Sequence, residues 1–151
     1  MMLVRTHVVF SIFFILIFLP HVSNSWIFVV MTMIATIVPD LDSKFSSYGR
    51  HIIFRPLQFF VTHRGIIHSF TTACLLSVAV AVFYPVASLG FFLGYGVHLL
   101  CDAFTKEGIQ PFWPLKMKSS GPITSGGRVD ETLFITMIGV DILVFLVIFV
   151  F

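Results

Sequence analysis

The chain has 151 residues, of which 58% are hydrophobic and 11% are Asp, Glu, Lys or Arg, and its mean hydropathy is +1.03. Soluble domains carry about 25% charged residues, so this composition excludes a soluble monomer and a disordered chain. A net charge of +2 is too small to indicate a nucleic-acid partner. We therefore expect an integral membrane protein with a single membrane-embedded domain, residues 1–151. Cys74 and Cys101 lie in apolar stretches and indicate no disulfide framework.

Apolar segments alternate with turn residues along the chain. In chain order they are residues 3–19, 26–38, 70–84, 89–104 and 133–151. The first two stop at Pro20 and Pro39, Ser69 is a candidate N-cap for the third, and residues 85–88 predict a turn before the fourth. A spanning helix needs about 20 apolar residues, so the first four are short and their polar ends should lie at or just below the membrane surface. We expect an all-α integral membrane protein, a compact bundle of about five transmembrane or membrane-embedded helices.

Two stretches between the segments, residues 40–68 and 105–131, carry nearly all the polarity. Residues 50–60 mix cations with bulky apolar side chains, as helices in the headgroup plane do, and predict an interfacial helix between the second and third segments. Phe112 and Trp113 suit the membrane–water boundary.

All nine Lys and Arg residues fall on the same side of the membrane as the N-terminus in this arrangement. They are Arg5, Lys44, Arg50, Arg55, Arg64, Lys106, Lys116, Lys118 and Arg128. Because cytoplasmic loops are enriched in Lys and Arg, we expect a multi-pass protein of the cell (inner) membrane with a cytoplasmic N-terminus and an outside C-terminus. One alternative is that residues 5–25 form a cleavable signal peptide. We favour a retained first helix because cleavage would remove His7, a candidate site residue.

Imidazoles and carboxylates gather at the same ends of the segments. The candidate metal ligands are His7, Asp40, Asp42, His63, His68, His98 and Asp102. Ionisable groups at membrane depth are costly, which makes them candidates for a functional site. His98 and Asp102 share one helical face and can ligate the same ion, although a simple His–Asp hydrogen bond is the alternative. Asp40 and Asp42 can turn toward a cation after Pro39, but such a pair alone is more often a cap or turn.

The ligand types indicate the kind of metal. A lone histidine is usually a polar end group, but four of the six histidines lie beside carboxylates at converging helix ends. Imidazole and carboxylate ligands without thiolates favour Zn²⁺ or Mn²⁺. Seven candidates exceed the four ligands of one tetrahedral site, so we expect a di- or multinuclear site with two or more divalent ions.

Several motifs stand in a recognisable order along nearly the whole chain. They are Thr6-His7, Pro39-Asp40-Leu41-Asp42, His63-Arg64-Gly65-Ile66-Ile67-His68-Ser69, Gly94-Tyr95-Gly96-Val97-His98-Leu99-Leu100-Cys101-Asp102, Gly108 with Trp113-Pro114, and a late Arg128 with Glu131. In this combination the chain resembles the YdjM-like membrane-bound metal-dependent hydrolases. The resemblance implies a small inner-membrane protein with a hydrolase site, and it supplies no substrate.

A weaker resemblance adds a substrate class. The order His, Asp, His, then His-x-x-x-Asp and a late acid is similar to the zinc-dependent phospholipase C and P1-type nuclease group, which cleaves phosphate esters with clustered zinc ions. The second His-x-x-x-Asp/Glu pair of that group is missing here, so the resemblance favours phosphoester chemistry without establishing it.

These features predict a metal-dependent hydrolase at the cytoplasmic leaflet that cleaves a phosphoester of a lipid or lipid-linked substrate, with membrane lipid as its partner. Arg64, Arg128 and Lys106 are candidates to contact the substrate phosphate. Glu131 is the candidate acid/base or a further ligand, because it begins the fifth segment just after two glycines that let backbone approach an anion. The alternative is that Glu131 and Asp130 only favour the positive end of a helix.

The competing hypothesis is a non-catalytic membrane metal-binding or transport protein that uses the same ligands. A carrier needs polar groups in mid-membrane, and the only charged residue there is Asp141, roughly 15 Å along the helix from Glu131. We expect Asp141 to hydrogen-bond Thr32 or Thr36 inside the bundle. A purely structural bundle is a third interpretation.

Overall fold

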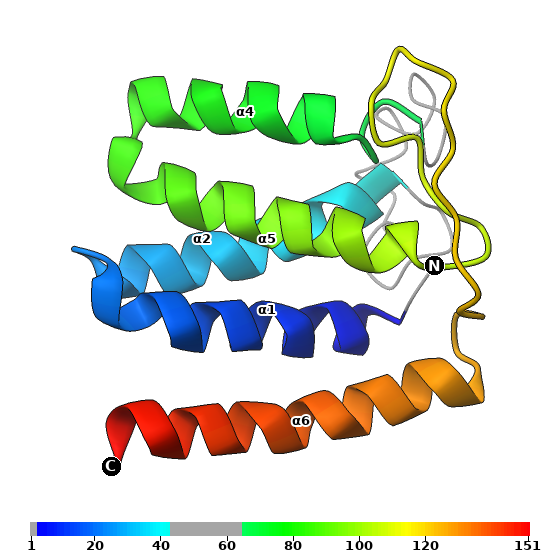
Figure 1. The fold of residues 1–151 in the computed structure, drawn as a ribbon. Coiled ribbons are helices and arrows are strands. Elements are labelled where there is room, and N and C mark those ends of the chain that lie inside the picture. The colour runs from blue at the N-terminus through cyan, green and yellow to red at the C-terminus, as the bar shows by residue number, and fades with distance from the viewer. Residues whose placement is uncertain (1–2, 43–64) are drawn as a thin grey trace.

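The structure, a computed structural model, describes residues 3–42 and 65–151, and the helices in these ranges run side by side (Figure 1). The bounds are α1 Val4–Phe18, α2 Ser25–Ile37, α4 Phe70–Phe83, α5 Pro85–Ala103 and α6 Arg128–Phe149, with 3₁₀ turns η1 at Leu19–His21 and η2 at Val38–Asp42. These ranges contain no β-strand beyond isolated bridges in the loop of residues 104–127. The predicted all-α membrane bundle is confirmed. The interfacial helix predicted at residues 50–60 lies outside the described residues.

The sequence predicts four short segments and one long one, and this is correct for α2, α4 and α6. It is wrong for the first and fourth segments, because η1 extends α1 and α5 starts early, at Pro85. Within the described ranges, Val4–His21, Pro85–Ala103 and Arg128–Phe149 are long and apolar enough to cross a membrane, whereas Ser25–Leu41 and Phe70–Phe83 are shorter apolar helices. Figure 1 shows η1, the α4–α5 turn and the C-terminus at one end of the bundle, and the start of α1 and the loop of residues 104–127 at the other. The described polar loop and the start of α1 therefore share one end.

The α4–α5 hairpin begins as predicted and turns more tightly than predicted. The Ser69 side chain caps α4 by accepting a hydrogen bond from the Thr72 amide. The turn expected at residues 85–88 is wrong, because α5 starts at Pro85. Proline suits the first turn of a helix, where its missing N–H leaves no hydrogen bond unmade.

α6 begins earlier than the apolar pattern indicates. It starts at Arg128 rather than Leu133, so the polar residues before the apolar run are already helical. Asp130 and Glu131 lie in its first turn, where the helix dipole favours negative charge. With α6 starting at Arg128, Asp130 faces the bundle and Glu131 is exposed.

The most extensive helix packing joins α2 to α5. A Cβ atom at Gly90 would come within 2.8 Å of the Phe28 carbonyl oxygen, and one turn further a Cβ at Gly94 would collide with the Thr32 carbonyl. The missing side chains let the two backbones approach closely, as small residues do between helices in membranes. Because Phe28 pairs with Gly90 and Thr32 with Gly94, the two helices run parallel toward the end that holds the polar loop.

α6 is the peripheral helix. It packs against α1 and exposes most of its apolar side chains, yet its Asp141 is buried. The predicted hydrogen bond from Asp141 to Thr32 or Thr36 is not formed, because α6 packs on α1 and the threonine hydroxyls bond within α2. Thr32 donates to the Phe28 carbonyl and Thr36 to the Thr32 carbonyl, both at 2.7 Å. Oδ1 of Asp141 has no hydrogen-bond partner among residues 3–42 and 65–151.

Candidate metal centre

His98 is positioned by the close packing of α2 and α5. It lies one turn beyond Gly94, and its Nδ1 is 2.7 Å from the carbonyl oxygen of Thr36. That carbonyl is among the last four of α2, which lack partners inside the helix. Because a carbonyl oxygen only accepts, Nδ1 carries the proton in the neutral ring and Nε2 keeps its lone pair. Nε2 faces Oδ1 of Asp40, in η2, at 3.7 Å.

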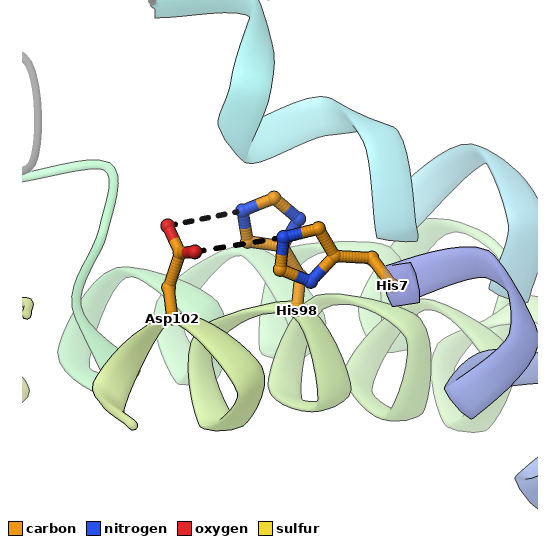
Figure 2. Close-up of side chains that lie close together, drawn as sticks. All are labelled: His7, His98 and Asp102. Carbon is orange, nitrogen blue, oxygen red and sulfur yellow. Dashed lines mark ion pairs between the residues drawn. The ribbon is translucent and has the colours of Figure 1, made fainter. Parts of the chain in front are cut away.

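His7 reaches the same point from the first turns of α1. Its ring stacks on that of His98, with centroids 4.2 Å apart and planes inclined by 15°. Figure 2 shows both rings directed toward the carboxylate of Asp102, one turn beyond His98 on α5. Nε2 of His7 lies 3.5 Å from Oδ1 of Asp102, and Nε2 of His98 lies 3.9 Å from Oδ2.

His68 approaches from the turn before α4. The Tyr95 hydroxyl donates to the Ile67 carbonyl at 2.8 Å and so fastens this turn to α5. Nε2 of His68 lies 3.7 Å from Oδ2 of Asp102. The rings of His68 and His98 are in edge contact, with centroids 5.4 Å apart. The turn thus brings a third imidazole to the end of α5.

Two overlapping ligand groups result. One contains His7, His98 and Asp102 and the other Asp40, His68 and His98, and within each group the ligand atoms lie within 4.8 Å of one another. All five side chains are 0–1% exposed. Burial of so many polar groups is costly unless they are bonded or bind a ligand.

The spacing within the cluster fits a divalent ion better than direct hydrogen bonds. The imidazole–carboxylate distances of 3.5–3.9 Å exceed the roughly 2.7–3.2 Å of a hydrogen bond. Two ligand atoms that share a tetrahedral ion at about 2.0–2.2 Å lie about 3.3–3.6 Å apart. Nε2 of His98 and both ring nitrogens of His7 make no hydrogen bond within the described part of the chain. The Nδ1–carbonyl contact of His98 is also typical of metal-bound histidines, so these buried groups could hold a metal ion.

Several predicted site residues are not part of this cluster or fall outside the described ranges. His63 and Arg64 lie outside the described residues, and Asp42 is described only as part of the η2 backbone. Arg128 and Glu131 are exposed in the first turn of α6. The Glu131 carboxylate is 3.4 Å from the Arg5 guanidinium, in an exposed ion pair.

Asp130 is the acid of α6 that faces the bundle. It was not among the predicted site residues. Its carboxylate is fully buried and accepts hydrogen bonds from the Thr6 hydroxyl at 2.7 Å, the Gly126 amide at 2.8 Å and the Leu3 amide at 3.2 Å. These bonds fasten the start of α6 to the start of α1, directly beside His7. Gly126, with φ of +69°, forms the turn that aims its amide at the carboxylate. The sequence contains both Thr6-His7 and the late acids Asp130 and Glu131. It does not show which of the two acids is buried.

The fold and the cluster define an all-helical membrane protein with buried His and Asp side chains that could hold a metal ion. The chain belongs to the YdjM inner membrane protein family, whose profile matches residues 1–150. It is 30% identical over 107 residues to the inner membrane protein YdjM of Escherichia coli (strain K12) and, to the same degree, to the protein of that name from Shigella flexneri. The match covers 65% of this chain and 55% of each relative, so the chain spans about half the length of these curated relatives. No solved structure matches it.

The comparisons confirm the family resemblance at the level of an inner-membrane protein. The names of the relatives state a location in the inner membrane and no activity. Any activity of this chain must therefore be argued from the cluster itself.

Proposed function

We propose that this inner-membrane protein is a metal-dependent hydrolase that cleaves a phosphoester of a lipid or lipid-linked substrate. The observation that supports it most directly is the position of the Asp102 carboxylate. Oδ1 faces Nε2 of His7 at 3.5 Å, and Oδ2 faces Nε2 of His68 at 3.7 Å. A carboxylate that presents one oxygen to each of two imidazoles suits two ions held side by side, and paired ions about 3.5–4 Å apart recur in enzymes that cleave phosphate esters.

In this proposal His7 and Asp102 would hold one ion, and Asp40, His68 and Asp102 would hold the other. Nε2 of His98 belongs to both ligand groups. It could coordinate only one ion, because the other ring nitrogen, Nδ1, is hydrogen-bonded to the Thr36 carbonyl. On the sequence alone, Asp42 and His63 are proposed as further ligands. The imidazole and carboxylate donors suit Zn²⁺ or Mn²⁺.

When bound, a divalent ion at such a site lowers the pKa of a water molecule toward about 7 and so supplies a nucleophile. Hydrolysis joins the water oxygen to phosphorus, breaks the P–O bond to the alcohol and leaves that alcohol with a proton. Arg64 and Arg128 are the proposed phosphate contacts, with Lys106. Glu131 is the proposed acid/base, and it must leave its exposed ion pair with Arg5 to act.

One observation favours a second candidate, a non-catalytic ion-binding protein. The five clustered side chains are almost completely buried, and a hydrolase must admit substrate and water to its ions. Transport is less well supported, because Asp141 is the only charged residue in the apolar interior of the described helices beyond the cluster. A carrier would need polar groups across that interior.

Metal content and hydrolysis together test these candidates. The detergent-purified protein is analysed for bound metals beside a His98→Ala/Asp102→Ala variant and a His21→Ala control, whose histidine is exposed in η1 at the other end of the bundle. We expect about two ions per chain in the wild type and the control, and a loss of metal in the double variant. Metal-dependent cleavage of a phosphoester bond in a phospholipid panel, detected as the released alcohol and phosphomonoester, supports the hydrolase. Bound metal without hydrolysis of any phosphoester or acyl ester supports the ion-binding candidate, and absence of metal contradicts both.

We also propose that the end of the bundle with the cluster faces the cytoplasm, with the C-terminus outside. The support is the distribution of Lys and Arg, none of which lies in a described turn at the opposite end. A reporter fused after Phe151 should read as non-cytoplasmic. A cytoplasmic result would overturn this orientation.

A further inference from the structure

Two adjoining cavities run along the face of α5 that carries Val97 and Leu100. The first, of about 230 Å³, lies between α5, Phe10 and Phe14 of α1 and Leu133 of α6. The second, of about 190 Å³, continues along α5 as far as Phe92. Val97 and Leu100 line both, so the two form one groove, here called the α5 groove.

The α5 groove has the length and chemistry of a site for an extended apolar chain. From Phe104 at one end to Phe92 at the other it follows twelve residues of α5, or roughly 18 Å of helix. Every residue that lines it is apolar apart from Cys101 and Gly96. It also opens sideways, because α6 packs on α1 rather than on α5 and leaves Leu100 and Phe104 about half exposed.

One end of the groove lies level with the buried His and Asp side chains along α1 and α5, on a different face of α5 from His98 and Asp102. Cys101 lines the groove and immediately precedes Asp102. Phe10, on the other wall, lies one helical turn beyond His7. A chain in the groove would therefore end within one turn of the cluster on both α1 and α5.

The same end carries a cation. The amide of Lys106 donates to the carbonyl of Ile123 at 2.9 Å, and Ile123 lines the groove. The exposed side chain of Lys106 therefore begins at the mouth of the groove. An ammonium group there complements a phosphate held at headgroup depth.

We infer that the α5 groove binds one acyl chain of a phospholipid, with the phosphate near Lys106 and the ester region at the level of the cluster. That this lipid is the substrate rests on the proposed function, whereas binding of the chain does not. Such a site differs from the lipid that covers any spanning helix, because the groove is continuous over two cavities and ends where the exposed Lys106 bonds to Ile123.

Photolabelling tests this inference. The intact protein is placed in phosphatidylcholine nanodiscs that contain a minor fraction of phosphatidylglycerol with a diazirine in its acyl chain, and the labelled peptides are mapped. We expect labels to concentrate at Phe10, Phe14 and residues 97–104. Leu100→Trp fills the groove from a partly exposed position, so it should lower this labelling severalfold, whereas Leu143→Trp, the same change at an exposed site on α6, should leave it unchanged.

The contrary outcomes are equally specific. Labels spread over α4 and α6 in proportion to exposure, or groove labelling unaffected by Leu100→Trp, would overturn the inference. Lys106→Gln should lower groove labelling about fivefold, the contribution of one lysine at a membrane surface, and unchanged labelling would contradict the position of the phosphate.

Metal analysis and phosphoester assays on the same samples separate this inference from the proposed function. Groove labelling without metal-dependent hydrolysis supports the lipid site and contradicts the hydrolase. Hydrolysis that Leu100→Trp leaves unchanged, with metal content also unchanged, contradicts the groove as the substrate site while the hydrolase stands.

Discussion

α5 and α6 are both long enough to cross a membrane, yet they occupy opposite extremes of burial. Slightly more than half of the spanning window of α5 is buried, against 6% for α6, although α6 has the higher mean hydropathy, 2.6 against 1.4. α5 presents Gly90, Gly94, His98 and Asp102 to its neighbours, whereas α6 is covered by bulky apolar side chains. Inside a membrane, apolar side chains gain little by leaving lipid, so small and polar residues mark the helix that is enclosed.

The largest difference between α5 and α6 is expected when one methyl group is added to each helix. Gly94→Ala puts a Cβ against the Thr32 carbonyl, and because backbone cannot yield as a side chain does, we expect destabilisation by about 3 kcal/mol or more together with loss of bound metal. Gly139→Ala in α6 is the matched control, since no described atom lies within 4 Å of its Cβ position. It should be neutral or slightly stabilising. Unfolding in detergent measures both, and equal stability of the two variants would refute the packing argument.

The attachment of α6 is the next point to test. Asp130→Asn removes the charge from a buried acceptor of three hydrogen bonds, so we expect a loss of about 2 kcal/mol in unfolding free energy. The variant should also loosen the start of α1 beside His7 and weaken metal retention. Proteolysis within residues 104–127 offers a second measurement. If Asp130→Asn unfolds like the wild type, the buried carboxylate does not hold α6 in place.

The contact between α1 and α2 should contribute less. Thr36 donates to the Thr32 carbonyl, so Ser11 is the donor in the 2.7 Å hydrogen bond between the Ser11 and Thr36 hydroxyls. Ser11→Ala and Thr36→Val should each cost about 1 kcal/mol. The double variant should cost less than the sum of the two, because both remove the same bond. Strict additivity in a double-mutant cycle would show that this bond contributes nothing to the docking of α1.

The smallest effect on stability is expected at Glu131. Its ion pair with Arg5 is exposed on both sides and screened by solvent, so Glu131→Gln should change the unfolding free energy by no more than about 0.5 kcal/mol. Under the proposed function the variant keeps its metal and loses hydrolysis. Loss of metal would instead make Glu131 a ligand, and unchanged hydrolysis would remove it from the mechanism.

The sequence was sufficient to predict the helices and the end of the bundle where the polar residues gather. Apolar runs in lipid must satisfy their backbone groups internally, and alternating helix directions place His7, His68 and His98 at one end. Neither prediction depends on which helices pack against each other. The convergence of Asp40 and Asp102 on the same point follows from the same alternation.

The remaining features depend on rotation and partner choice. Asp130 and Glu131 point about 100° apart on a helix, so which one is buried depends on the start of α6 at Arg128, and the apolar pattern places that start five residues too late. Gly90 and Gly94 precede His98 at four-residue spacing, which is a visible signal for close packing. The sequence does not show that α2 is the partner, because that depends on the three-dimensional arrangement of helices that are far apart in the chain.

The five clustered side chains come from widely separated parts of the chain, between residue 7 and residue 102. During synthesis α1 and α2 enter the membrane well before α5, so no nascent intermediate can offer the complete set of donors. An ion that recognises only the assembled bundle would stabilise it by an amount that depends on supply, about 2.7 kcal/mol when free ion exceeds its Kd by about 100-fold. Cellular metal levels would then govern how much of the newly made protein escapes proteolytic quality control, and biogenesis would depend on metal supply.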